Sequence, residues 1–204
     1  MELCQEQYQL QVHKNTTVTA ELLKEKAYDS VIFAYGTKEI FPPFEGREEA
    51  NLILGTDLLE HPEKAEGANN IVIVGGGVVG CETAHWLANE YGKNVTVLEM
   101  LPHFMMGVCT ANRGHLLHYL EKSGVRLYNC NKGKSDLTKD GVYVEQNQSQ
   151  TVPDPYNTWQ PLLPPNIPNP MEKSNQKKKS WRSKIPADLI VLVNGGKADE
   201  YIFL

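Results

Sequence analysis

The chain has 204 residues, of which 41% are hydrophobic and 22% charged, and its formal net charge is -5 at pH 7. This length predicts one complete domain plus part of a second, because domains usually have about 100 to 200 residues. The composition argues against a nucleic-acid or membrane partner, and with neither a signal-like start nor the roughly 20 apolar residues of a membrane helix we expect a cytoplasmic protein.

The first third of the chain predicts short elements. In chain order they are a strand over 10–12, a helix over 19–26, a strand over 30–34 and a short helix over 56–61. Thr19 is the expected cap of the first helix, and Gly36 follows the second strand. A loop that contains Pro42 and Pro43 separates this strand from the short helix, which indicates a crossover between domains.

From residue 69 onward, strands alternate with helices. The predicted elements are a strand over 71–74, a helix over 78–91, a strand over 95–98, a helix over 110–123, and strands over 125–128 and 188–193. Such alternation is typical of a parallel sheet flanked by helices. The prediction is therefore an α/β fold: a Rossmann-like, doubly wound parallel sheet of the FAD/NAD(P)-binding type, with a small β-meander or crossover.

A long proline-rich, basic loop is predicted at about 149–186. Most of the 12 prolines lie there, and the run of lysines from Lys177 to Lys179 favours solvent. Three apolar residues in this segment, Trp159, Leu162 and Leu163, suggest that part of the loop docks on a neighbouring surface.

One internal repeat bears on the domain organisation. Segments 28–38 and 187–197 share an acid, an apolar run, a glycine and a lysine in the same order. Two similar strands that flank a nucleotide-binding unit are expected when one dinucleotide domain is inserted into another. We therefore predict that residues 1–47 are part of an FAD-domain-like segment and that residues 48–204 are an NAD(H)-binding domain interrupted by the loop.

The motif GxGxxG follows the buried strand at 71–74 and opens the next helix. Its glycines are Gly75, Gly77 and Gly80. The first permits a tight turn, the second lets a pyrophosphate approach the backbone, and the third lets the helix pack on the strand. The N–H groups of this turn and of the first helical residues form the expected anion site, which adds Gly76, Val78 and Val79 to the candidate cofactor-binding residues.

Glu99 ends the next strand, about 20 positions after Gly80, where a Rossmann motif places an acid for the ribose hydroxyls. Its carboxylate would repel a 2′-phosphate, and no Lys or Arg follows within residues 100–109, so NADH is favoured over NADPH. Met100 adjoins this acid as a candidate cofactor contact. Glu82 is a further candidate, which faces either the pocket near the ribose and nicotinamide or the solvent. The sequence does not favour one of these two orientations over the other.

No metal site or nucleophile is predicted. The four cysteines form no CxxC or CxxxxC pair, and no carboxylate or cysteine completes a ligand set around His115 and His118.

These segments together resemble a known family, the pyridine-nucleotide reductase part of old-yellow-enzyme-like flavoproteins. The family comprises 2-enoate reductase, 2,4-dienoyl-CoA reductase and trimethylamine dehydrogenase. The resemblance rests on segments 28–46, 71–88, 94–102, 115–128 and 187–196. It implies that NADH reduces FAD, and that electrons then pass through an iron-sulfur cluster to an FMN that reduces a conjugated double bond.

The resemblance also places Gly36 and Gly195 beside the flavin, although Tyr35 is bulkier than the threonine usual in that turn. An earlier GxGxxG, cluster cysteines and an FMN barrel are not in this sequence, so we expect a segment of a larger enzyme that binds the cofactor without turnover. Its expected partners are the dinucleotide, the missing flavin and iron-sulfur domains, and a second copy in a homodimer. Two alternatives remain open: a non-catalytic dinucleotide-binding or interaction domain, and the nucleotide domain of a disulfide reductase.

Overall fold

A computed structural model describes residues 10–131, 136–147, 152–158 and 180–198. The chain forms two compact units, Met1–Gly36 and Thr37–Leu204, which are described separately below. The predicted boundary between an FAD-domain-like segment, residues 1–47, and an NAD(H)-binding domain, residues 48–204, stays a prediction.

In the described part of the first unit, residues 10–36, there is one helix, α2 (Ala20–Lys26). The predicted cap is confirmed, because the hydroxyl oxygen of Thr19 accepts the N–H of Leu22 at 3.3 Å. The strands predicted at 10–12 and 30–34 are wrong: both stretches lack strand structure and have no ladder partner among the described residues. An apolar run forms a strand only when a neighbouring strand takes up its N–H and C=O groups, and Ile32 is 91% exposed.

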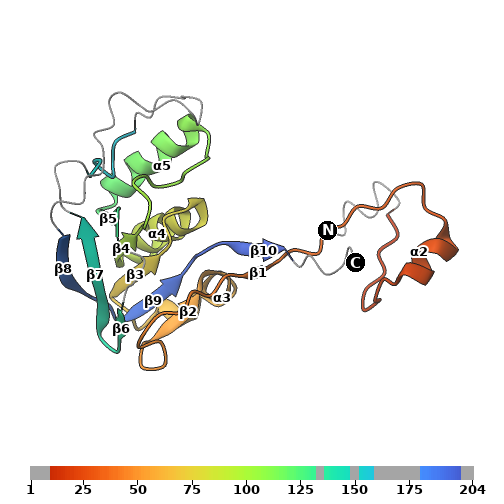
Figure 1. Cartoon of the computed structure of the whole chain (residues 1–204), viewed down its shortest axis with the longest axis horizontal. Coiled ribbons are helices and arrows are strands. Elements are labelled where there is room, and N and C mark those ends of the chain that lie inside the picture. Colours follow the sequence, from red (N-terminus) through yellow and green to blue (C-terminus); the bar gives the residue numbers. More distant parts are fainter. Residues whose placement is uncertain (1–9, 132–135, 148–151, 159–179, 199–204) are drawn as a thin grey trace. The chain divides into compact units, whose positions relative to one another are not determined.

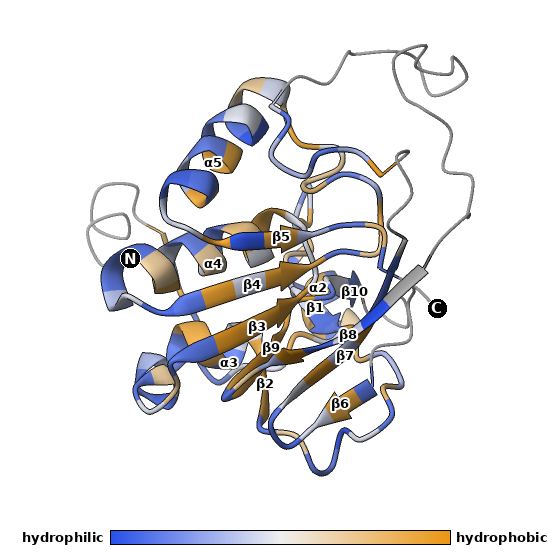
Figure 2. Cartoon of the chain, turned by 90° about the vertical axis from the view of Figure 1, so that its left-hand side faces the viewer, coloured by the Kyte–Doolittle hydropathy of each residue, from blue (hydrophilic) through white to orange (hydrophobic). Residues whose placement is uncertain are grey.

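The second unit is built around a five-stranded parallel sheet of order β2-β9-β3-β4-β5 (Figure 2). Its strands are β2 (Leu52–Leu54), β9 (Leu189–Leu192), β3 (Asn70–Val74), β4 (Asn94–Leu98) and β5 (Arg126–Tyr128). Ile73 of the central strand pairs with Val97 on one side and with Val191 on the other. The predicted α/β class with a Rossmann-like parallel sheet is confirmed.

Two layers cover this sheet, one on each face (Figure 1). The helical layer comprises α3 (Gly55–Glu60), the short 3-10 helix η1 (Pro62–Ala65), α4 (Val78–Tyr91) and α5 (Thr110–Lys122). The other layer is an antiparallel meander of β6 (Asp136–Thr138), β7 (Gly141–Asn147) and β8 (Ser180–Pro186). Ile71 and Ile73 pack into the helical core, whereas Val72 and Val74 pack toward the meander. Burial on both faces explains why β3 is apolar at nearly every position.

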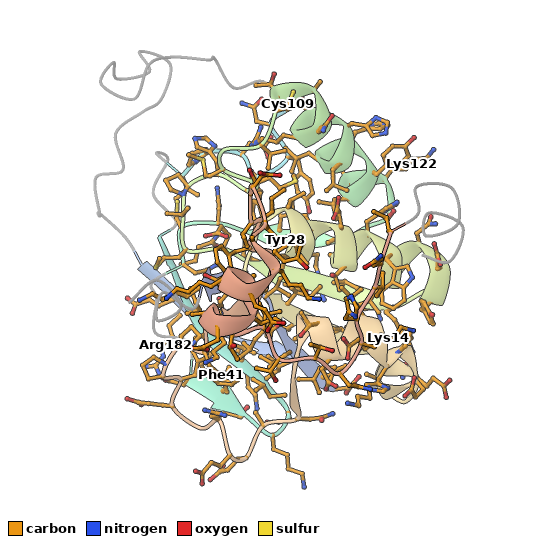
Figure 3. All side chains as sticks on the ribbon, turned by 90° about the vertical axis from the view of Figure 1, so that its right-hand side faces the viewer. Lys14, Tyr28, Phe41, Cys109, Lys122 and Arg182 are labelled. Atoms are coloured by element: carbon orange, nitrogen blue, oxygen red, sulfur yellow. The ribbon has the colours of Figure 1, made fainter. Side chains whose placement is uncertain are left out.

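The helices end where the sequence predicts within a residue or two. Helix α4 begins at Val78 and is closed by Gly92, whose φ of 63° lies in the left-handed region. Cys109 and Lys122 mark the two ends of α5 (Figure 3). Within the described residues, no helix has the length and apolar run needed to cross a bilayer.

The predicted loop at 149–186 needs correction at its C-terminal end. Residues 180–186 form β8, which pairs with β7 throughout its length. The basic residues of this strand gain acidic partners from the meander: Lys184 contacts Asp140 at 2.6 Å and Arg182 contacts Asp136 at 2.8 Å. The prediction missed the strand because β7 was not predicted either. Lys177 to Lys179 and the three apolar residues that start at Trp159 lie outside the described residues.

The internal repeat ends in a pair of short strands. β1 (Thr37–Glu39) and β10 (Gly196–Ala198) pair antiparallel, with Lys38 opposite Lys197. The apolar run of the second copy is β9, an inner strand of the sheet between β2 and β3, whereas that of the first copy is not a strand.

Candidate functional site

A cavity of about 480 Å³ opens at the carboxyl ends of the parallel strands, within the size range of small-ligand sites. Crevices of this kind are where open α/β sheets bind ligands. The lining residues all belong to the second unit: Pro42, Phe44, Val74, Gly75, Gly77, Leu98, Glu99, Met100, Asn131, Val193, Asn194 and Gly195.

The glycine-rich turn connects β3 to α4 at the edge of this cavity. Gly75 has a φ of 121°, and a Cβ at this position would collide with the carbonyl oxygen of Val193, which follows β9. A Cβ at Gly80 would collide in turn with the carbonyl oxygen of Gly75. The two glycines therefore let the turn pass close to β9 and let α4 pack close to the turn.

Gly76 and Gly77 differ in what surrounds them. A Cβ on the buried Gly76 would lie 2.5 Å from Cδ1 of Phe104 and 2.8 Å from Cβ of Glu99. A Cβ on Gly77 would meet nothing within 4 Å, and this residue lines the cavity. Gly77 is also the N-cap of α4 and makes no side-chain cap hydrogen bond. The first N–H groups of a 14-residue helix are thus available beside open space, an arrangement that fits a phosphate group.

Glu99 is tied to the same turn by both carboxylate oxygens. Oε2 accepts the N–H of Gly76 at 2.7 Å, and Oε1 accepts the N–H of Leu101 at 2.8 Å. Each oxygen of a carboxylate has a second lone pair, so Glu99 retains acceptor capacity toward the cavity that it lines. Met100, 63% exposed, lines the cavity next to it.

Two asparagines bring polar atoms to the cavity that the sequence reasoning did not identify. The Asn131 side chain donates from Nδ2 to the carbonyls of Glu99 (3.1 Å) and Tyr128 (2.6 Å), which fixes its orientation. Its Oδ1 is buried and has no hydrogen-bond partner among the described residues, and the same holds for Nδ2 of Asn194. Buried polar atoms are nearly always paired, so these two fit a site that receives a polar ligand.

Part of the cavity lining comes from a distant part of the chain. Pro42 and Phe44, in the loop that precedes β2, line the same cavity as the turn after β9, where Gly195 has a φ of 76°. No spacing in the sequence connects this loop to the glycine motif, so only the structure identifies it.

The remaining predicted residues lie away from the cavity lining. Val78 and Val79 are 38% and 45% exposed at the start of α4, and Glu82 is exposed further along this helix. Gly36 belongs to the first unit, so its flavin contact stays a prediction. The role of Glu82 also stays a prediction.

Cys81, the residue after the motif, is a buried thiol. Its Sγ lies 3.6 Å from the carbonyl oxygen of Gly76. Burial, with a smaller contribution from the negative charge of Glu99, raises the pKa of Cys81 to about 12. The group is therefore a neutral thiol at physiological pH and not a thiolate nucleophile.

Comparison with known proteins agrees with this geometry. The profile of a family described as pyridine nucleotide-disulphide oxidoreductase matches residues 2–201. An NADH oxidase of Thermoanaerobacter brockii is 32% identical over 57% of the chain and 18% of its own length. A cinnamate reductase of Clostridium sporogenes is 27% identical over 70% of the chain and 21% of its own length.

A solved structure, a 2-naphthoyl-CoA reductase complex, shares the fold. It superposes with a TM-score of 0.69 and 23% identity over 98% of the chain and 25% of its own length. The chain thus spans about a fifth of the length of the two curated relatives and a quarter of this structure.

Proposed function

This chain belongs to the pyridine nucleotide-disulphide oxidoreductase family, and we propose on this basis that its second unit binds NAD(H) as the electron-entry site of a flavin-dependent oxidoreductase. The two cofactors expected from the sequence, NAD(H) and FAD, agree with the family. When bound, NADH supplies a hydride to the flavin. The protein binds and orients the dinucleotide.

The observation that supports this proposal most directly is the open start of α4. Gly77 caps the helix without a side-chain hydrogen bond and borders the cavity, so backbone N–H groups and the helix dipole are available to a pyrophosphate. Gly75 and Gly80 make this arrangement sterically possible. The residues that we assign to the pyrophosphate are therefore those from Gly75 to Gly80.

The carboxylate of Glu99 is the proposed acceptor for the adenosine ribose hydroxyls. It lines the cavity next to the glycine turn and is held there by two backbone N–H groups. None of the described residues that line this cavity is a lysine or arginine, so a 2′-phosphate would meet a carboxylate without a neutralising cation. We infer a preference for NADH over NADPH.

For the whole protein, we propose an enzyme of the old-yellow-enzyme-like group that reduces a conjugated double bond. The similarity to a cinnamate reductase over 70% of the chain supports this assignment. In such a protein, domains that carry FAD, an iron-sulfur cluster and FMN would be the partners of this segment. Gly36 and Gly195 would lie beside the FAD, and a cytoplasmic homodimer is the assembly that we propose.

Calorimetric titration of the chain with NADH, NADPH and FAD tests the proposed site. The matched variants are Gly77→Val and Gly67→Val, because a Cβ at either position meets nothing within 4 Å but only Gly77 lines the cavity. We expect NADH to bind wild type and Gly67→Val alike and to show no binding to Gly77→Val, with NADPH at least several-fold weaker. Equal NADH affinity for Gly77→Val and wild type would reject the site.

A further inference from the structure

Arg113 of α5 is a cation buried behind the glycine turn. It is 2% exposed and is among the largest fully buried side chains in the described part of the chain. Its Nε donates to the carbonyl oxygen of Phe104 at 2.9 Å, and Nη1 donates to the carbonyl oxygen of Asn157 at 3.1 Å. The guanidinium thus joins α5 to two loops.

The contacts of Phe104 and its neighbour connect Arg113 to the candidate site. The Phe104 ring packs where a Cβ of Gly76 would lie, and the N–H of Met105 donates to the carbonyl oxygen of Gly76 at 2.8 Å. The thiol of Cys81, which also faces that carbonyl, is close enough to Arg113 for an electrostatic interaction. The guanidinium is therefore connected to Gly76 through Phe104 and Met105, and it lies within electrostatic range of Cys81 in the first turn of α4.

Among the described residues, both acceptors of this guanidinium are neutral carbonyls, and no carboxylate forms an ion pair with it. Burial lowers the pKa of Arg113, which reflects the cost of keeping its charge away from water. A buried cation without an anion is unfavourable. An anion that binds at the adjacent start of α4 would offset this cost, because charges interact strongly where water is excluded.

We propose that Arg113 provides the buried counter-charge for the pyrophosphate of the dinucleotide and positions the glycine turn that contacts it. The inference rests on the dinucleotide site proposed above and adds a residue to it that lies outside the GxGxxG motif. Arg113 acts through the turn and is a positioning residue. A residue that only held the loops in place would affect every ligand of the site equally, whereas a counter-charge affects ligands that carry the pyrophosphate.

The test compares ADP-ribose, which carries the pyrophosphate, with adenosine, which has no phosphate, as competitors of NADH in a fluorescence titration. In Arg113→Met we expect ADP-ribose to bind about tenfold more weakly and adenosine to change by less than about threefold. Arg113→Lys, which retains a positive charge, should stay within about threefold of wild type for both ligands. Arg126→Met removes an exposed charge from β5 and should leave both affinities unchanged.

The proposed counter-charge role would be rejected if Arg113→Met lost affinity for ADP-ribose and adenosine equally, or lost affinity for neither. Thermal unfolding shows whether the methionine variant is folded. If it is not folded, Arg113→Lys and Arg113→Gln are compared instead, because lysine keeps the positive charge and glutamine does not. The measured quantity is again the loss of ADP-ribose affinity relative to the loss of adenosine affinity, which should be larger in Arg113→Gln. Failure of wild type to bind NADH and ADP-ribose would instead reject the proposed site, and the role of Arg113 with it.

Discussion

Glu99 shows at the scale of one residue how a side chain can hold the fold and select a ligand. Its oxygens accept the N–H groups of Gly76 and Leu101, and the same carboxylate lines the cavity. In Glu99→Gln an amide nitrogen replaces one oxygen, so the charge is lost and one N–H loses its acceptor. The negative charge that would repel a 2′-phosphate therefore disappears together with a hydrogen bond.

We expect Glu99→Gln to reduce the preference for NADH over NADPH by about tenfold, a change of about 1.4 kcal/mol in relative affinity. The thermal midpoint should fall, since losing a typical hydrogen bond costs about 0.5–1.5 kcal/mol. Titration with both nucleotides and a melting curve measure the two effects. Glu90→Gln is the matched control, because this acid of α4 is exposed and does not line the cavity. An unchanged preference in Glu99→Gln would remove Glu99 as the selector.

The buried thiol of Cys81 should make the free energy of unfolding depend on pH in the alkaline range. Burial raises the pKa of its thiol from 9.0 to about 12 in the folded state. The unfolded chain therefore loses the thiol proton first, and the stability that Cys81 contributes is present below pH 9 and declines as the pH rises toward 12. The expected slope is about 1.4 kcal/mol per pH unit at most. Urea unfolding of wild type and Cys81→Ala between pH 8.5 and 10.5 should show a steeper decline in wild type, and parallel curves would contradict it.

At the scale of elements, one side chain joins the starts of two neighbouring strands, β9 and β3. Oδ2 of Asp188, just before β9, accepts the N–H groups of Asn69 (3.0 Å) and Asn70 (2.8 Å) at the start of β3. Because the two strands begin together, Val74 and Leu192 end side by side at the cavity edge. The contact far from the cavity thus supports the geometry of the glycine turn.

These hydrogen bonds also lower the pKa of Asp188 below 3.8. The stability that they contribute is therefore present above pH 3.8 and is lost as the pH falls through the lowered value. We expect Asp188→Ala to have a lower Tm than wild type at pH 7, and the two melting temperatures to converge in strong acid. Melting curves from pH 7 to about pH 2 measure this, and a constant difference at every pH would show that the carboxylate is not responsible.

On the scale of the whole molecule, the candidate site belongs to one unit. All residues that line the cavity lie within Thr37–Leu204, and so do Arg113 and the loops that it contacts. The first unit supplies the predicted flavin contact at Gly36 but none of the cavity residues. Dinucleotide binding is therefore expected not to require the first unit.

Removal of residues 1–36 should leave the NADH affinity within about threefold of the full chain. A ligand at 100 times its Kd adds about 2.7 kcal/mol to the free energy of unfolding, so saturating NADH should raise the Tm of both forms by roughly 5–10 °C. Differential scanning fluorimetry checks both expectations. Loss of NADH stabilisation in the shortened chain, with the fold retained, would show that the first unit contributes to the site.

Local pattern was sufficient to predict the centre of the second unit. The apolar run before Gly75, the helix from Val78 to Tyr91 and the strand before Glu99 were all recognised from the sequence, because hydrophobic period and glycine spacing are properties of neighbouring residues. The same reasoning failed at residues 30–34. That apolar run resembles β9, but it is not a strand and pairs with no neighbouring strand among the described residues.

The sequence by itself therefore determined the fold class, the glycine turn and the acid at the end of β4. Only the tertiary structure decided that β7 and β8 pair, that Phe44 lines the same cavity as the glycine turn, and that Asn131 and Arg113 are buried. The physical reason is distance along the chain. Whether a strand is paired, a charge is buried or a polar atom lacks a partner depends on residues that come together from separate segments. The spacing of neighbouring residues does not determine these features.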